Sequence, residues 1–76
     1  MKEILKTIIE NLVDDTESIE IFEKEDNNII ELQVKISKDD MGKVIGKQGK
    51  TANAIRTLMK SVAGKENKKI AIEFID

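Results

Sequence analysis

The chain has 76 residues, which is room for one domain built around a single small core. Hydrophobic residues make up 39% of it and charged residues 37%, a balance typical of folded domains and not of disordered chains. Cysteine, histidine, tryptophan, tyrosine and proline are absent. Disulfide frameworks, thiolate or imidazole metal sites and histidine-activated nucleophiles are therefore excluded, and we expect no enzyme, no metal site and no cofactor.

The formal net charge of −2 conceals an uneven distribution of charge along the chain. Residues 1–40 contain twelve acidic and five basic side chains, whereas residues 41–76 contain eight basic and three acidic ones. This asymmetry indicates one face that attracts an anionic partner. The alternative is that the two halves interleave in space and their charges only solvate the surface. Charge by itself does not decide between these interpretations.

An amphipathic helix is predicted at the start of the chain, where six apolar residues recur at helical spacing between polar ones. They are Ile4, Leu5, Ile8, Ile9, Leu12 and Val13. The helix is expected to end near Asp14 and Asp15. This segment contains Glu3 and Glu10 and does not resemble a signal peptide, and no apolar run approaches the roughly 18 residues of a membrane span. We expect a cytoplasmic protein without a membrane partner.

Two strands joined by a tight connection are predicted next. Residues 18–24 alternate between apolar and polar side chains as far as Phe22, which we expect in the core together with Phe74. Residues 30–36 alternate more strictly, as a strand does when one face is buried. Residues 25–28 read Glu-Asp-Asn-Asn, and Asp and Asn side chains favour turns.

Two helices and a last strand complete the predicted order. Ser37 and Asp40 have the spacing of a capping box, so the first of these helices is predicted over residues 38–45. The second helix begins just past Gly49, and a strand over residues 69–75 follows it. The order helix, strand, strand, helix, helix, strand predicts an α+β domain.

The turn between these two helices is the most informative segment. Gly46 and Gly49 bound it, so a ligand can approach the backbone closely while the amides of the next helix point toward it. Lys43, Lys47 and Lys50 surround the turn and favour a bound phosphate. Two glycines three residues apart are by themselves a weak signal, because helix ends and turns often contain them.

The segment Val44-Ile45-Gly46-Lys47-Gln48-Gly49-Lys50 resembles the Ile-Gly-x-x-Gly core of the KH domain, whose GXXG loop clamps four nucleotides of a single strand. The element order resembles the type II, bacterial form of that fold, with three helices on one face of a three-stranded sheet. The stretch from Gly42 to Leu58 is similar to the small stand-alone RNA-binding proteins of the KhpA family. The resemblance implies one KH domain over residues 1–76, with a core unit at about residues 29–75.

The resemblance also implies which residues bind RNA. They are Gly46, Lys47, Gln48 and Gly49 in the clamp, Lys43 and Lys50 beside it, and Ile45 and Ala52 on the near wall of an apolar groove for bases. The far wall is expected from the sheet edge at residues 70–74. The presence of only two aromatic residues in the chain argues against readout by stacking bases on rings, whereas a groove with aliphatic contacts remains open.

We therefore expect a non-catalytic protein that binds single-stranded RNA, as an RNA chaperone or post-transcriptional regulator. The resemblance implies a homodimer and a larger KH-containing bacterial partner linked to cell elongation and division. The alternative is a dimerisation or protein-interaction module for which RNA binding is secondary. Small size favours it, as do apolar residues such as Met59 and Ile75 that a thin domain is expected to leave partly uncovered.

Overall fold

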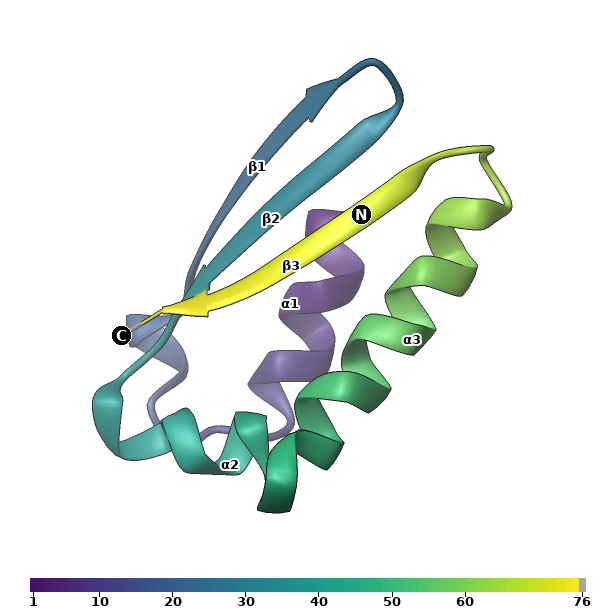
Figure 1. Cartoon of the computed structure of the whole chain (residues 1–76). Coiled ribbons are helices and arrows are strands. Elements are labelled where there is room, and N and C mark those ends of the chain that lie inside the picture. Colours follow the sequence, from purple (N-terminus) through teal and green to yellow (C-terminus); the bar gives the residue numbers. More distant parts are fainter. Residues whose placement is uncertain (76) are drawn as a thin grey trace.

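The fold is a three-stranded sheet with all three α-helices on one of its faces (Figure 1). The computed structural model describes residues 1–75. The elements are α1 (Lys2–Glu10), β1 (Glu20–Asp26), β2 (Ile29–Lys35), α2 (Met41–Ile45), α3 (Lys50–Gly64) and β3 (Lys69–Ile75), with single 3₁₀ turns at Thr16–Ser18, Lys38–Asp40 and Lys47–Gly49. The α+β class, the element order and the one-sided helix layer expected from the sequence are confirmed.

The sheet has the order β1-β2-β3, with an antiparallel pair and a parallel pair. β1 and β2 form a hairpin whose two turn residues, Asn27 and Asn28, have φ values of 51° and 64°. Two-residue hairpin turns need positive φ, which Asn tolerates better than most residues. β3 pairs with β2 in parallel, so the chain has to cross over between them, and α2 and α3 form that crossover.

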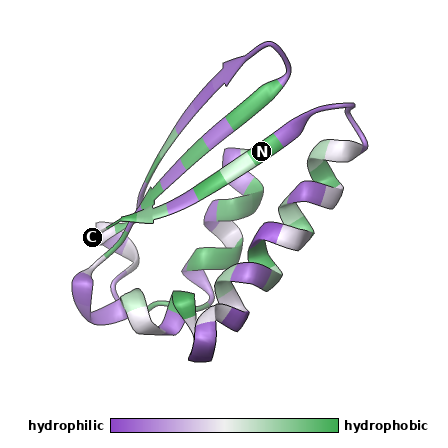
Figure 2. Cartoon of the chain, in the orientation of Figure 1, coloured by the Kyte–Doolittle hydropathy of each residue, from purple (hydrophilic) through white to green (hydrophobic). Residues whose placement is uncertain are grey.

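The core lies between the inner face of the sheet and the helices, and the sequence periods place residues there. On β2 the residues alternate between exposed and buried, and on α3 the buried residues recur every three or four positions. The fully buried large side chains are Leu5, Ile9, Ile30, Leu32, Val34, Val44 and Met59. Figure 2 shows the hydrophobic stripes of the helices turned toward the sheet. The expectation that Met59 would remain partly uncovered is therefore wrong.

α1 ends earlier than its apolar pattern. Its last residue is Glu10, and the N–H groups of Leu12 and Val13 both donate to the carbonyl of Ile9, at 2.9 and 3.1 Å. This tight turn keeps Leu12 and Val13 against the core without continuing the helix. The apolar residues of this segment therefore continue to pack on the core after α1 has ended.

The outer face of the sheet is open, and Phe22 lies on it. Phe22 shares its face of β1 with Glu20 and Lys24 and is 51% exposed, so the prediction that it belongs to the core is wrong. Ile29 on β2 is exposed on the same face, at 45%. Phe74 is half-buried and packs against the core, which agrees with its prediction. The period of two along a strand separates its residues into two faces, but only the position of the helix layer decides which face is buried.

Asp40 is the one charged residue among those described that is buried, at 3% exposed. Its carboxylate accepts hydrogen bonds from the backbone N–H groups of Asp14 and Asp15, at 3.3 and 3.0 Å. The predicted capping box is therefore wrong, because Asp40 bonds to the chain after α1 and Ser37 makes no side-chain cap. The bond from the Asp15 N–H is the main cause that lowers the pKa of Asp40, and burial opposes it.

Replacing Asp40 with Asn should lower the melting temperature at neutral pH, because an uncharged amide is a weaker acceptor for two N–H groups. The folded pKa of Asp40 is depressed, so its stabilising contribution is present above the unfolded pKa of about 3.9 and is lost as the pH falls through the lower folded value. Thermal unfolding of wild type and Asp40→Asn should therefore converge below pH 4. Asp39→Asn, at an exposed neighbour, is the control and should change little.

Candidate nucleic-acid interface

The turn between α2 and α3 has a backbone that ordinary residues rarely adopt. Gly46 has φ 75° and ψ 177°, a region open almost only to glycine, and Gly49 is left-handed at φ 73° and ψ 12°. Gln48, between them, is also left-handed at φ 56° and ψ 27°. The backbone of the turn therefore requires glycine at position 46 and favours it at position 49.

Gly46 has a second constraint, which comes from packing. A Cβ at this position would lie 2.8 Å from Thr51 Cβ and 3.0 Å from the Thr51 backbone nitrogen. Gly49 is less confined, since a Cβ there would meet only Asn53 Nδ2, at 3.9 Å. The first turn of α3 thus packs directly on the start of the loop.

The tip of the turn presents backbone donors and cations to the solvent. The Gly49 N–H donates to the Gly46 carbonyl at 3.3 Å, which closes the turn. Lys47 and Gln48 are the first two residues of the 3₁₀ turn Lys47–Gly49, so their N–H groups precede its first backbone hydrogen bond. Both residues and Lys50 are exposed, and neither lysine forms a salt bridge with the described part of the chain. Free amides beside ammonium groups are the arrangement that binds a phosphate.

Lys43 has a different environment from the other lysines near the turn. Its ammonium group bonds to the Asp14 carboxylate and lies 3.6 Å from Asp40. The hydrogen bond to Asp14 is the main cause that raises the pKa of Lys43. The charge of Lys43 is thus already balanced by two carboxylates from elsewhere in the fold, which the spacing of residues around the turn could not show.

The two apolar residues assigned to the near wall lie at different depths. Ile45, at the end of α2, is half-buried and has surface available, whereas Ala52 is 1% exposed and faces the core. The two helices that carry them, α2 and α3, contact each other.

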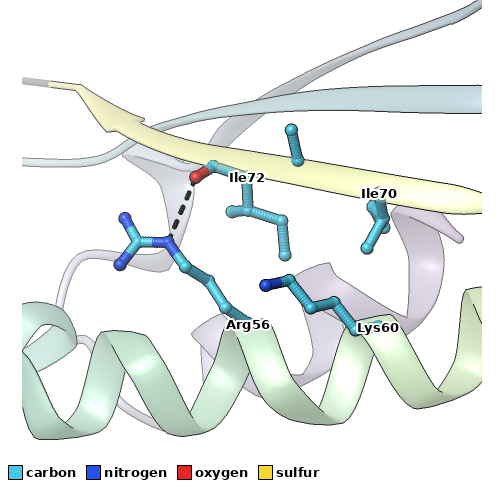
Figure 3. Close-up of a pocket in the computed structure, with 5 residues that line it drawn as sticks. Arg56, Lys60, Ile70 and Ile72 are labelled. Atoms are coloured by element: carbon cyan, nitrogen blue, oxygen red, sulfur yellow. Dashed lines mark hydrogen bonds between the residues drawn. The ribbon is translucent and has the colours of Figure 1, made fainter.

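A hollow of about 230 Å³ lies between α3 and the edge strand β3, where the far wall was expected. Arg56, Lys60, Ile70, Ala71 and Ile72 line it, and Figure 3 shows Arg56 and Lys60 extending from α3 toward β3. Arg56 Nε donates to the Ile72 carbonyl at 3.3 Å, and its guanidinium lies 5.3 Å from the centre of the Phe74 ring. Sequence reasoning did not assign Arg56, although its position one helical turn beyond Ala52 placed it on the same flank.

Two properties of the described residues bear on other functions. None of the helices in residues 1–75 has the length and apolar content of a membrane span. The same residues contain no group of three or more acidic side chains placed to hold a metal ion.

Comparison with known proteins identifies the family. The sequence model described as "KhpA/KhpB, KH domain" matches residues 2–74. The chain belongs to the KhpA/KhpB KH-domain family. The family match contains the whole turn, both helices beside it, β2 and all but the last residue of β3.

Curated relatives agree over their full length. The RNA-binding protein KhpA of Clostridium perfringens is 49% identical over 75 residues, which covers 99% of this chain and all of the relative. The KhpA of Clostridium acetobutylicum is 47% identical with the same coverage, and that of Listeria monocytogenes is 43% identical over 76 residues and all of both chains. No solved structure gives a significant match. The KH fold of this family member therefore rests on its sequence relatives and its own architecture.

Gly46→Ala should reduce the free energy of unfolding by about 1–3 kcal/mol, since alanine is strained at this φ and ψ and its Cβ meets Thr51. Gly49→Ala should cost less, about 1 kcal/mol, because alanine tolerates the left-handed region better and has space there. Urea denaturation of both variants measures the difference. Equal losses would show that packing on Thr51 does not restrict the loop.

Proposed function

We propose that this chain is a non-catalytic protein that binds single-stranded RNA, with the turn from Gly46 to Gly49 as the clamp on the phosphates. The observation that carries the proposal is the solvent-facing turn. The N–H groups of Lys47 and Gln48 precede its first backbone hydrogen bond, and the ammonium groups of Lys47 and Lys50 form no salt bridge with residues 1–75. Glycine at both ends lets the nucleic-acid backbone approach the amides. The names of the curated relatives, RNA-binding proteins, support the same ligand class.

The shape of the site favours a single strand over a duplex. The KH loop clamps about four nucleotides of a single strand, and splayed bases then need a surface beside the loop. Ile45 and the hollow at β3 provide that surface, whereas Ala52 is buried beneath it. Base contacts there are aliphatic or polar, with Arg56 as the charged group nearest to the exposed edge of β3. Lys43 can contact an RNA phosphate only while its ammonium group is also paired with Asp14 and Asp40.

The proposed biological setting extends this binding activity. The chain acts as one KH domain over residues 1–76, with the RNA-binding unit at about residues 29–75. It works in the cytoplasm as an RNA chaperone or post-transcriptional regulator that affects bacterial cell elongation and division. Resemblance to the family supports this setting, and RNA crosslinking in cells followed by sequencing tests it through the transcripts recovered.

Lys47→Asp combined with Gln48→Asp should abolish RNA binding, because two carboxylates would face the phosphates at the tip of the turn. The fold should survive, since both side chains are exposed and Asp tolerates the left-handed backbone of position 48. Gel shifts or fluorescence anisotropy with a short single-stranded RNA measure binding, and thermal unfolding measures the fold.

The matched control makes the same chemical change elsewhere. Lys24→Asp with Gln33→Asp alters one exposed lysine and one exposed glutamine on the open face of the sheet. This control should retain most of the RNA affinity. Wild-type binding by the Lys47/Gln48 variant, or equal losses in both double variants, would contradict the assignment of the turn as the clamp.

Self-association is a second candidate function, and exposed apolar side chains favour it. Leu58 on α3 is 51% exposed and Ile4 on α1 is 44% exposed, while Phe22 and Ile29 are exposed on the open sheet face. A domain this small gains stability when a second copy covers such residues. The proposed partners are therefore a second copy of this chain and a larger KH-containing bacterial protein.

Sedimentation of the purified chain should show a dimer that dissociates on dilution. Leu58→Lys and Phe22→Lys each place a charge on one of the two exposed surfaces, so the variant that becomes monomeric identifies the interface. Lys6→Glu, at an exposed position of α1, serves as the control with an altered surface charge. A wild-type chain that remains monomeric at millimolar concentration would count against self-association.

A further inference from the structure

The open face of the sheet, opposite the helices, is hollowed along its length. All three α-helices lie on the other face (Figure 1). The open face has three hollows, with volumes of about 140, 370 and 300 Å³. Glu31 on the central strand β2 lines all three, while Lys24 and Gln33 each line two. The hollows therefore adjoin around Glu31 and form one surface.

Each strand contributes one apolar side chain to this surface. Phe22 on β1 is 51% exposed and Ile29 on β2 is 45% exposed, and Ala71 on β3 is exposed as well. Each of these residues lines a different one of the three hollows. A sheet face with apolar groups spread over all its strands can pack against another layer of structure.

Carboxylates determine what kind of layer can cover the surface. Asp26, Glu31 and Glu73 are exposed and form no salt bridge with residues 1–75. Lys24 lies opposite Glu31 in the register of β1 and β2, yet the two do not form a salt bridge either. Because Glu31 lines all three hollows, any occupant covers its carboxylate, which is costly unless the occupant brings a cation. The charges therefore favour a basic occupant.

The dimensions of the face match one α-helix. Each of the three strands has seven residues, so the face is about 23 Å long at about 3.3 Å per residue. A spacing of about 4.8 Å between strands puts the two outer strands about 10 Å apart. An α-helix with its side chains is about 10–12 Å wide, and about 15 residues of helix span the same 23 Å.

We propose that the open face of the sheet docks a basic amphipathic helix of another protein. The apolar stripe of that helix packs on Phe22, Ile29 and Ala71, and a lysine or arginine beside the stripe pairs with Glu31. This inference goes beyond the proposed functions, because it assigns a second binding surface to a different class of partner. The turn between α2 and α3 belongs to the helix layer, so RNA and the docked helix are bound at the same time.

A second copy of this chain and an RNA strand both fit this face less well. A closed dimer through the open face would have the same surface on both sides, so the carboxylates of one copy would meet those of the other. If the second copy offered its basic α3 instead, the contact would be heterologous and would build open chains. RNA phosphates would approach Glu31 and Glu73 and be repelled.

Two designed peptides test the surface. The first is a helix of about 15 residues with leucine at every third or fourth position and lysine elsewhere. The second has glutamate in place of each lysine. Each is added to the ¹⁵N-labelled chain, and amide chemical shifts locate the binding. The lysine peptide should shift amides along β1, β2 and β3, including those of Phe22, Gln33 and Ala71, whereas the glutamate peptide should not bind.

A double variant and a matched control separate this face from the rest of the surface. Phe22→Lys/Glu73→Lys should weaken binding of the lysine peptide about tenfold or more, because it removes an apolar contact and reverses a charge. Leu58→Lys/Glu10→Lys makes comparable changes on the helix layer, where Leu58 is also 51% exposed, and should bind as wild type does. Thermal unfolding checks that both variants fold. A uridine tetranucleotide should leave the affinity for the lysine peptide unchanged.

Several outcomes would overturn the inference. They are no binding of the lysine peptide, binding of it to the helix layer, equal binding of both peptides, equal losses in both double variants, or displacement of the lysine peptide by the tetranucleotide. Loss of self-association in Phe22→Lys would also overturn it, since a second copy would then be the occupant. A chain that binds the lysine peptide on the open face but no RNA would contradict only the proposed clamp.

Discussion

The candidate RNA site depends on one backbone constraint, which is that α2 and α3 must meet in a turn that only glycine permits at its first position. Gly46 adopts φ 75° and ψ 177° and has Thr51 packed against it. Because Thr51 belongs to the first turn of α3, the loop and the helix start are fixed as one unit. The outward position of Lys47 and Gln48 and the direction of α3 toward the edge of the sheet follow from this contact.

The distribution of charge explains how an acidic chain can have a cationic site. Several carboxylates balance particular lysines, as Asp14 and Asp40 do for Lys43 and Glu25 does for Lys68. Lysines along α3 and the start of β3 remain without such partners in the described part of the chain. A local positive potential therefore coexists with a negative net charge. The interpretation that the two halves interleave holds in part, because acidic side chains of the first half pair with lysines of the second half at these ion pairs.

Local patterns predicted the elements well where one physical cause dominated. The alternation in residues 30–36 predicted a strand with a buried face, and the recurrence of Ile55, Met59 and Ala63 predicted the buried side of α3. Predictions failed where local and tertiary causes competed. Asp40 has capping-box spacing from Ser37, yet its carboxylate bonds to backbone N–H groups about 25 residues away in the sequence. Phe22 is apolar but belongs to the strand face that no helix covers.

The sequence by itself determined the element order, the glycine-bounded turn and the residues at its tip, because these depend on periodicity and on backbone preferences of neighbouring residues. Only the tertiary structure decided that the charge of Lys43 is held by Asp14 and Asp40, that Arg56 bonds to the edge of β3, and that Lys60 and Lys69 line one hollow. These features join residues that are distant in the chain. Their positions follow from how the helix layer packs on the sheet, which no local pattern contains.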